Sequence, residues 1–227
     1  TINFVGLFSA EKSVYHGSNI SAKNIPADYM QFYNIAQAPV EDQSFNPSYQ
    51  GYQDSGLRSM MVRAMYFYDD RYMLTLAVRK DESSRLSKDN NAHTYPAISA
   101  GWNVAKESFM SSFDWLNSLK LRVGYGETSN QAVAPYKTLG LLSQRATNLG
   151  DDLVYAYYVS ELPNPELGWE YSKTMNYGVD FGFLNNRLTG SFEYYVQKTN
   201  DVLLAVSLPA TTGVSSIMSN IGKTENK

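Results

Sequence analysis

Cysteine is absent from this chain of 227 residues, which excludes disulfide bonds and thiolate metal sites. Long apolar runs are also absent, because no stretch reaches the roughly 18 residues that a membrane-spanning helix needs. Basic residues are not in excess: the net charge is -3 at pH 7, and no run of Lys or Arg forms a basic stripe. The sequence therefore argues against a transmembrane helix and against nucleic acid as a partner.

Recognisable catalytic and metal-binding motifs are missing as well. His16 and His93 are far apart and lack the ligand spacing of a metal site. Gly124-Tyr125-Gly126 has no third glycine, so it is not a dinucleotide-binding motif, and no Walker or Gly-x-Ser-x-Gly motif occurs. The acidic stretch 81–91 does not have the spacing of an EF-hand. We expect no catalytic residue, no cofactor and no metal, and hence no enzyme.

Aromatic residues, by contrast, are plentiful. They make up 14% of the chain, yet the mean hydropathy is only -0.36. The mean hydropathy stays low because apolar residues alternate with polar ones. This alternation is clearest in residues 178–197, on both sides of Asn185-Asn186. Because successive side chains of a strand point to opposite faces, this hairpin has one apolar and one polar face. The apolar set is Val179, Phe181, Phe183, Leu188, Phe192, Tyr194 and Val196. Such a pattern is typical of strands between lipid and water.

The same alternation recurs in residues 57–68, 72–79, 98–106 and 119–126, and residues 1–9 form a further plausible strand. Short turns at 69–71 and 185–186 and a moderate connection at 106–118 alternate with long irregular segments at 10–55 and 128–170. A patch within 28–35 could form a short amphipathic helix. Alternating short and long connections predict an all-β, antiparallel up-and-down transmembrane barrel, with the long segments as extracellular loops. An antiparallel sandwich that buries the same apolar face is the alternative.

Aromatic girdles are expected where such a barrel meets the two membrane surfaces. Tyr68, Tyr72, Phe181 and Phe183 lie beside the short turns and predict one girdle. The other girdle is predicted from three residues nearer the opposite ends of the strands, Tyr95, Tyr125 and Tyr194.

The ends of the chain indicate a segment of a longer protein. It opens on Thr1 without an initiator Met or a signal peptide, and it closes on Lys227 within what reads as a strand. About seven or eight strands are predicted, so the barrel would be incomplete here. Its two open edges and its apolar face would then need covering.

The residues themselves, and not only their alternation, resemble the SusC-like (SusC/RagA) TonB-dependent outer-membrane transporters. The stretches that carry the resemblance are 66–72, 78–85, 95–96, 99–102, 119–126, 130–131, 164–170, 176–190, 208–213 and 220–222. They run in order through residues 57–227, whereas residues 1–56 match loosely. The chain departs from the family pattern at Glu82, where Gly is usual, and at Leu86, where an aromatic is usual.

The resemblance implies that residues 1–227 are part of a barrel of about 22 strands, a size class whose lumen is plugged. The plug, the TonB box and the closing strands would lie outside these residues. On that reading the polar face of the strands lines the lumen and contacts the plug or water. The candidates are Arg63, Arg79, Lys120, Arg122, Asp180 and Glu193, which on a sandwich would be ordinary solvent residues.

Four aromatic residues of the second long segment are candidates for a ligand or lid contact. Tyr155, Tyr157, Tyr158 and Trp169 could stack on sugar rings or close under a lid lipoprotein, or they could pack the loop against itself. The resemblance implies import of an oligosaccharide or peptide through the outer membrane of a Gram-negative bacterium. It implies as partners outer-membrane lipid, a SusD-like lipoprotein and TonB. The alternatives are a stand-alone small barrel or adhesin, and a secreted glycan-binding sandwich.

Overall fold

The computed structural model describes residues 1–30 and 33–227, with the backbone alone for residues 45–50. Its regular elements are strands joined by short 3-10 helices. The strands are β1 Ile2–Ala22, β2 Gln43–Tyr68, β3 Tyr72–Ser83, β4 Ala92–Asn103, β5 Leu116–Asn130, β6 Leu141–Leu149, β7 Asp152–Glu161, β8 Glu170–Phe183, β9 Leu188–Asn200, β10 Leu203–Ser207, β11 Ser216–Asn220 and β12 Lys223–Asn226. The 3-10 helices are η1 Asp28–Met30, η2 Ile35–Gln37, η3 Val40–Asp42, η4 Val104–Lys106, η5 Ser108–Met110 and η6 Ala210–Thr212. None of the described helices is long and apolar enough to cross a membrane.

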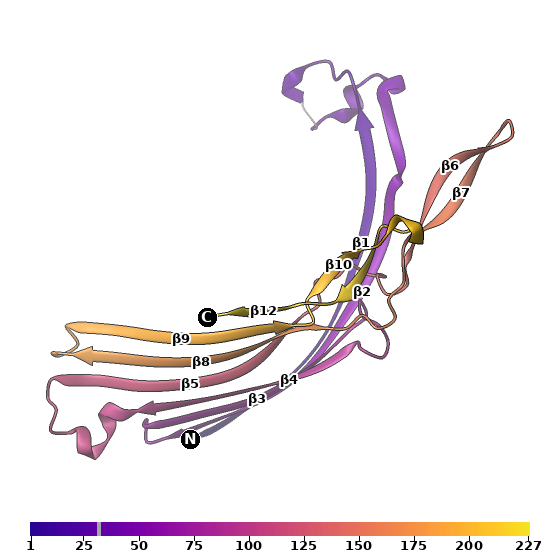
Figure 1. Cartoon of the computed structure of the whole chain (residues 1–227). Coiled ribbons are helices and arrows are strands. Elements are labelled where there is room, and N and C mark those ends of the chain that lie inside the picture. Colours follow the sequence, from indigo (N-terminus) through magenta and orange to yellow (C-terminus); the bar gives the residue numbers. More distant parts are fainter. Residues whose placement is uncertain (31–32) are drawn as a thin grey trace. The chain divides into compact units, whose positions relative to one another are not determined.

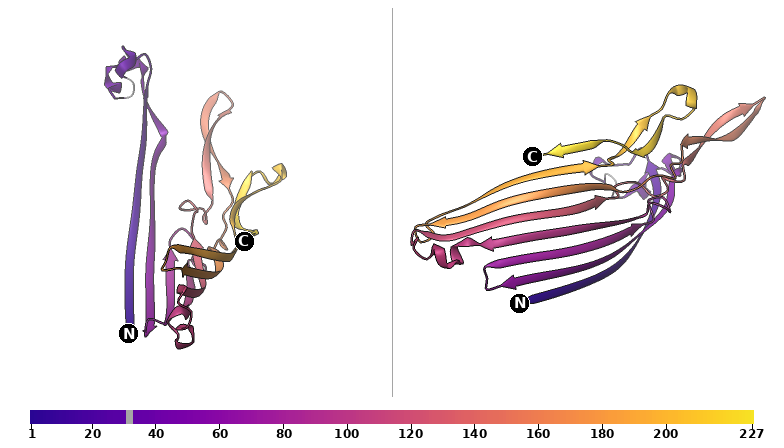
Figure 2. Two further views of the ribbon diagram at one scale, coloured as in Figure 1. Left: turned by 90° about the vertical axis from the view of Figure 1, so that its left-hand side faces the viewer. Right: turned by 60° about the horizontal axis from the view of Figure 1, so that its bottom comes forward.

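The main sheet has eight strands in the order β1-β2-β3-β4-β5-β8-β9-β12, so each strand lies beside the previous strand of the sheet (Figure 1). The pairings from β2 to β12 are antiparallel. Two separate hairpins, β6–β7 and β10–β11, are inserted between strands of the main sheet. Figure 2 shows β3, β4, β5, β8 and β9 side by side. The predicted all-β, up-and-down segment of about seven or eight strands is confirmed, and the sheet is not closed.

The chain divides into two compact units. One comprises Thr1–Glu11 with Gly56–Lys227, and the other comprises Lys12–Ser55. The smaller unit contains the distal parts of β1 and β2 with η1, η2 and η3. Within it, Lys12 Nζ lies 3.3 Å from an Asp54 carboxylate oxygen, and His16 meets Tyr52 edge to face with ring centroids 5.0 Å apart.

The prediction that residues 10–55 are irregular is wrong for most of this range, because β1 continues to Ala22 and β2 begins at Gln43. A strand can continue without an apolar face when both of its faces meet water, and alternation then gives no signal. The predicted amphipathic helix within 28–35 is also wrong: two 3-10 turns, η1 and η2, stand there. The interval between Pro26 and Pro39 is too short for a stable isolated α-helix. Phe32 of that patch lies outside the described residues.

Both predicted tight turns are confirmed. Between β2 and β3, Asp69 and Asp70 adopt positive φ angles of 49° and 50°. Between β8 and β9, Asn185 and Asn186 adopt positive φ angles of 56° and 60°. Asp and Asn tolerate this left-handed region better than most residues, and the two central residues of a type I′ turn require it.

The long segment 128–170 is less irregular than expected. It contains the end of β5 and the whole β6–β7 hairpin, so Tyr155, Tyr157 and Tyr158 lie on a strand. β10 and β11 pair with each other and not with β9, and the chain rejoins the main sheet only in β12.

Candidate functional site

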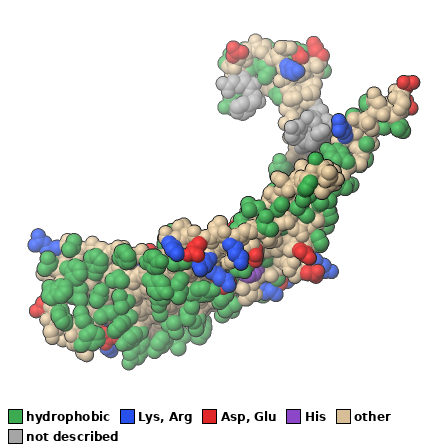
Figure 3. Space-filling model, in the orientation of Figure 1, with side chains coloured by type: hydrophobic (Ala, Val, Ile, Leu, Met, Phe, Trp, Pro, Cys, Tyr) green, Lys and Arg blue, Asp and Glu red, His purple; other side chains and the backbone are tan. Residues whose placement is uncertain are grey.

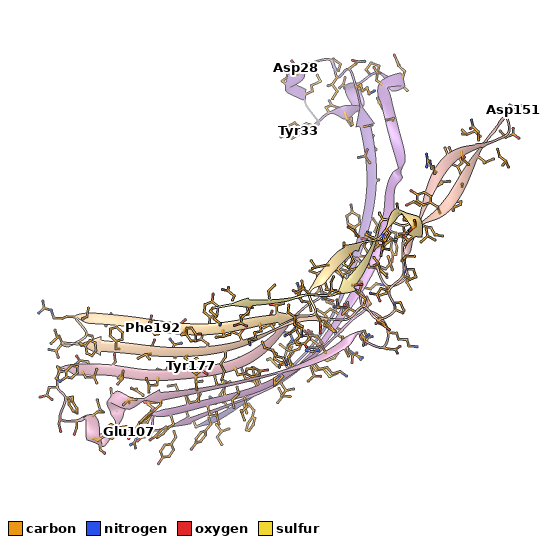
Figure 4. All side chains as sticks on the ribbon, in the orientation of Figure 1. Asp28, Tyr33, Glu107, Asp151, Tyr177 and Phe192 are labelled. Atoms are coloured by element: carbon orange, nitrogen blue, oxygen red, sulfur yellow. The ribbon has the colours of Figure 1, made fainter. Side chains whose placement is uncertain are left out.

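One face of the main sheet is apolar across six strands in register. A row of directly paired residues runs Tyr66, Leu74, Ala100, Val123, Tyr177 and Tyr194, from β2 to β9. Phe192 is 65% exposed and Val62 is 64% exposed. Figure 3 shows these strands as a broad expanse of hydrophobic side chains, and Figure 4 marks Tyr177 and Phe192 on neighbouring strands. We call this surface the apolar belt.

The belt is uncovered within the described part of the chain. Leu76, Trp102, Val123 and Phe192 are exposed, and Phe181 is partly exposed. The sandwich alternative, which would bury this face, is therefore wrong for the described residues. Soluble monomers rarely expose apolar patches of this extent, so the belt requires a non-aqueous environment.

Charged pairs end the belt on the side of the long connections. On the same face as Val78, Glu82 pairs with Arg58 and with Lys80, in the latter case at 3.0 Å. On the neighbouring strands, Lys173 lies 3.4 Å from Glu127. The belt from Met60 to Tyr68 rises roughly 27 Å along the strand, which is about 20 Å along the membrane normal at a tilt of about 40°. This height is close to the apolar band of an outer-membrane barrel, about 25 Å.

The girdle beside the short turns agrees with expectation, because Tyr68, Tyr72, Phe181 and Phe183 all lie on the belt face. The assignment of Tyr95 to the other girdle is wrong. Tyr95 pairs with Arg79 on the opposite face, is only 9% exposed and donates its hydroxyl to Asp81. Tyr125 and Tyr194 do lie on the belt face.

The six polar-face candidates share the face opposite the belt. Arg63 and Arg79 lie there on β2 and β3, and Lys120 lies opposite Asp180 in the pairing of β5 with β8. Arg122 and Glu193 both lie opposite Gly178. Their common face follows from the register.

Arg122 organises the charges of this face. Its Nε and one terminal nitrogen donate to the two Asp180 oxygens at 2.8 and 2.9 Å, and the same terminal nitrogen donates to Glu193 Oε1 at 2.7 Å. The guanidinium lies over Gly178, where an added Cβ would come within 2.9 Å of its central carbon. The missing side chain therefore makes room for the ionic triad of Arg122, Asp180 and Glu193.

Small residues give the polar face a shallow hollow. A depression of about 300 Å³ is lined in part by Thr75, Ser99, Gly124, Lys120 and Arg122. Arg63 differs from Arg122 in that its Nε is buried and meets no acceptor among the described residues. Arg79 is engaged within the chain, with Nε 2.8 Å from Asp81 and a terminal nitrogen 3.2 Å from Ser59 Oγ.

A small hydrophobic core lies at the ends of the strands opposite the short turns. We call it the rim core. It consists of Leu86, Val133, Leu167 and Trp169, with Leu57, Leu203 and Met218 packed against it. Leu167 is fully buried and Trp169 is 7% exposed, with its indole N–H 3.0 Å from the Asn91 carbonyl oxygen. Trp169 is therefore not available to stack on a ligand, because packing and a backbone hydrogen bond use it.

Asparagine side chains tie the rim core together. Asn220 accepts from the Gly168 N–H at 2.7 Å and donates to the Gly168 carbonyl oxygen at 3.0 Å. Asn164 donates to the Met218 carbonyl oxygen at 2.7 Å and accepts from the Glu166 N–H at 3.0 Å. The motifs 164–170 and 220–222 thus meet in space and brace the connections β5–β8 and β9–β12.

The three tyrosines of β7 are exposed. Tyr155 and Tyr157 pair with Ala146 and Gln144 and lie on one face of the β6–β7 hairpin, while Tyr158 lies on the other. Leu142 and Leu153 share the face of the first two and are also exposed. This hairpin offers an apolar and aromatic contact surface.

The described residues contain no group of three or more His, Asp or Glu side chains that could hold a metal ion. His93 stacks between Tyr95 and Tyr171, at centroid distances of 5.6 and 5.3 Å. His16 lies in the smaller unit and meets Tyr52.

Sequence reasoning missed Glu107, in the β4–β5 connection. Its carboxylate accepts hydrogen bonds from Tyr72 Oη at 2.6 Å, Trp102 Nε1 at 2.9 Å and an Arg71 nitrogen at 3.4 Å. The Tyr72 hydroxyl first, then the Trp102 indole and Arg71, hold the pKa of Glu107 below its ordinary value. A signal was present, since Glu107 directly follows the predicted strand 98–106, which contains Trp102.

An open antiparallel sheet with a membrane-high apolar belt on one face and charged and small residues on the other defines a segment of a transmembrane β-barrel. Residues 3–227 match the family model described as TonB dependent receptor-like, beta-barrel, and the chain belongs to this family.

Its relatives include TonB-dependent receptor P26 of Formosa agariphila, 36% identical over 91% of this chain and 20% of that protein. TonB-dependent receptor SusC of Bacteroides thetaiotaomicron is 36% identical over 75% of this chain and 17% of SusC. The RagAB peptide transporter structure superposes with a TM-score of 0.76 at 25% identity, covering 99% of this chain and 24% of that one. The chain spans about a fifth of the length of the Formosa agariphila receptors it matches. The predicted SusC-like resemblance is confirmed, and outer-membrane location and transport are the properties this family implies.

Proposed function

We propose that this chain is part of the barrel wall of an outer-membrane nutrient importer of a Gram-negative bacterium. One observation supports this most strongly. In a member of the TonB-dependent receptor family, one face of the sheet carries an apolar belt of nearly the height of a barrel's apolar band, and the opposite face is polar. Residues 1–227 would supply eight of the roughly 22 strands, and the plug and closing strands would come from elsewhere in the protein.

The polar face would face the lumen and hold the plug. The triad of Arg122, Asp180 and Glu193 is satisfied within the chain, so its role there is to stiffen the wall. Arg63, with its unmatched buried Nε, and Lys120, in the wall of the hollow, are the better candidates for plug acceptors. No step in this role makes or breaks a covalent bond.

The two rims would face different compartments. Short connections at 69–71 and 184–187 are typical of the periplasmic side, and the long segments 10–55 and 128–170 are typical of the extracellular side. The exposed face of the β6–β7 hairpin, with Tyr155 and Tyr157, would contact a SusD-like surface lipoprotein or the incoming substrate. Aromatic rings suit both partners, because they bury a large area on a rigid side chain.

The substrate class we propose is an oligosaccharide or a peptide, with the energy for import supplied through TonB. RagAB, the similar solved structure, is a peptide transporter. SusC is a relative by sequence.

The test is uptake by the intact receptor in its own cells. Outer-membrane fractionation should place the protein in the membrane. Labelled glycans and peptides should enter wild-type cells and fail to enter cells that lack either the receptor or TonB. Affinity purification under mild detergent should recover a surface lipoprotein. Recovery of the protein from the culture supernatant, or uptake indifferent to TonB, would contradict the proposal.

A further inference from the structure

The β4–β5 connection, residues 104–115, carries three exposed aromatic side chains. Phe109, Phe113 and Trp115 are 59%, 44% and 53% exposed. Phe109 lies within η5, and Phe113 and Trp115 follow it. The charged residues of the connection are Lys106, Glu107 and Asp114. A water-facing turn of this length does not need three aromatic rings, so their exposure calls for an explanation.

Glu107 fixes the side of the sheet on which this connection begins. It is bonded by Tyr72 Oη and Trp102 Nε1, and both of these side chains belong to the apolar belt. Lys106 lies 3.2 Å from Asp70 in the neighbouring turn, and Asn103 N–H donates to the Arg71 carbonyl oxygen at 2.7 Å. The connection is therefore tethered to the belt face, and Figure 4 shows Glu107 at the end of the strands beside the short turns.

The far end of the connection also joins the belt face. Trp115 stacks on Phe183 with ring centroids 5.6 Å apart, and Phe183 stacks on Phe181 at 5.2 Å. Phe113 meets Trp115 edge to face at 6.2 Å. A chain of four rings thus runs without a break from the belt into the connection.

We propose that the β4–β5 connection is an interfacial membrane anchor that inserts Phe109, Phe113 and Trp115 among the phospholipid headgroups at the short-turn rim. This inference rests on the proposed outer-membrane function. The phospholipid surface is the occupant that the ring chain indicates, because the anchor continues the belt surface through the stack of Trp115 on Phe183. Tyr72 and Trp102, bonded to one carboxylate, would hold the anchor at headgroup depth, where amphipathic rings reside.

The test is a depth measurement in the full-length receptor reconstituted in phosphatidylethanolamine–phosphatidylglycerol vesicles. Residues 1–227 contain no cysteine, so Phe109→Cys and Phe113→Cys can each carry a single nitroxide once any cysteine outside this range is replaced. Collision with oxygen and with a water-soluble nickel chelate reports depth. Two controls bracket the result: Val62→Cys on the belt face of β2, and Leu149→Cys at the exposed tip of the β6–β7 hairpin.

We expect both Phe labels to fall between the two controls, within about 10 Å of the headgroup boundary, and to stay there in high salt. Labels as accessible to nickel as the Leu149 control would overturn the anchor. So would labels shielded from both probes, since the rings would then pack on the plug or on another protein. A water-accessible Val62 label would instead contradict the proposed membrane function itself, so the two failures are distinguishable.

As a further check, Glu107→Ala should free the Phe109 nitroxide, seen as a narrower line shape and a shift toward nickel accessibility. The Val62 signal should stay unchanged. An unchanged Phe109 spectrum would show that the tether does not position the anchor.

Discussion

The apolar belt and the rim core use the same kinds of side chain in opposite surroundings. In the rim core, Leu167 is fully buried and Trp169 is 7% exposed, because side chains from several distant segments of the chain pack around them. In the belt, Phe192 and Val62 remain more than half exposed. Under the proposed function, water surrounds the rim core and lipid covers the belt. Substitutions should therefore have different costs in the two regions.

Removing the Trp169 side chain should have the largest effect. Trp169→Ala deletes a buried indole and its hydrogen bond to Asn91, which should lower the free energy of unfolding by about 3–5 kcal/mol. Urea titration of the reconstituted receptor, followed by gel mobility of folded and unfolded barrels, measures this. The matched control is Tyr157→Ala on the exposed hairpin, which should stay within about 0.5 kcal/mol of wild type. Equal losses for both would mean that the rim core is not a core.

A charge in the belt should come next. Val123→Lys places an ammonium near the middle of the apolar band and should destabilise the folded barrel by about 2–4 kcal/mol in vesicles. Ser99→Lys lies one residue away in the sheet on the polar face and should cost much less. The same urea titration compares them. If the lysine on the polar face proved the more costly of the two, the assignment of faces would be reversed.

The polar side of the same wall allows a finer comparison between two glycines. Gly178→Ala would force the Arg122 guanidinium away from Asp180 and Glu193, and should cost about 1–3 kcal/mol through weakened charge-assisted bonds. At Gly126 an added Cβ would meet the Ala97 Cβ at 3.7 Å, an ordinary contact. Gly126→Ala should therefore be nearly neutral in the same titration. A neutral Gly178→Ala would mean that the triad can rearrange freely.

The smallest effect should be the acid response of the Glu107 tether. Because the folded state lowers the pKa of this carboxyl, its stabilising contribution is complete above the ordinary glutamate value of about 4.5. It is lost only as the pH falls below that value and through the lower folded pKa. The Phe109 nitroxide should therefore keep its line shape down to about pH 4.5 and become mobile in more acidic solution. Mobility that rises already between pH 7 and 5 would contradict this order.

Much of the sheet could be predicted because apolar and polar side chains alternate along each strand that has one apolar face. The alternation of Tyr72, Leu74, Leu76 and Val78 with their neighbours reports the belt, and with it the shared face of Arg63, Arg79, Lys120, Arg122, Asp180 and Glu193. Beyond the belt both faces of a strand meet water. The distal part of β1 and the β6–β7 hairpin therefore left no period to read.

The parts that could not be predicted depend on contacts distant in sequence. Asn220 meets Gly168 across 52 positions, and the Trp169 indole meets Asn91 across 78. No local pattern indicates that Trp169 is buried while Tyr157 is exposed. The ionic triad is similar: a charge on the polar face is visible in the sequence, but its partner on the next strand depends on the register.

The Asn220 amide has a consequence for the strand that follows it. By bonding both backbone groups of Gly168, it fixes where the chain leaves the rim, and Gly222, at a φ of +95°, turns it into β12 with Lys223 opposite Asn200. A slip of one position at that entry would move each side chain of β12 to the opposite face of the sheet. The side-chain amide of Asn220, at the rim, thus helps to set which face of the sheet each residue of β12 takes.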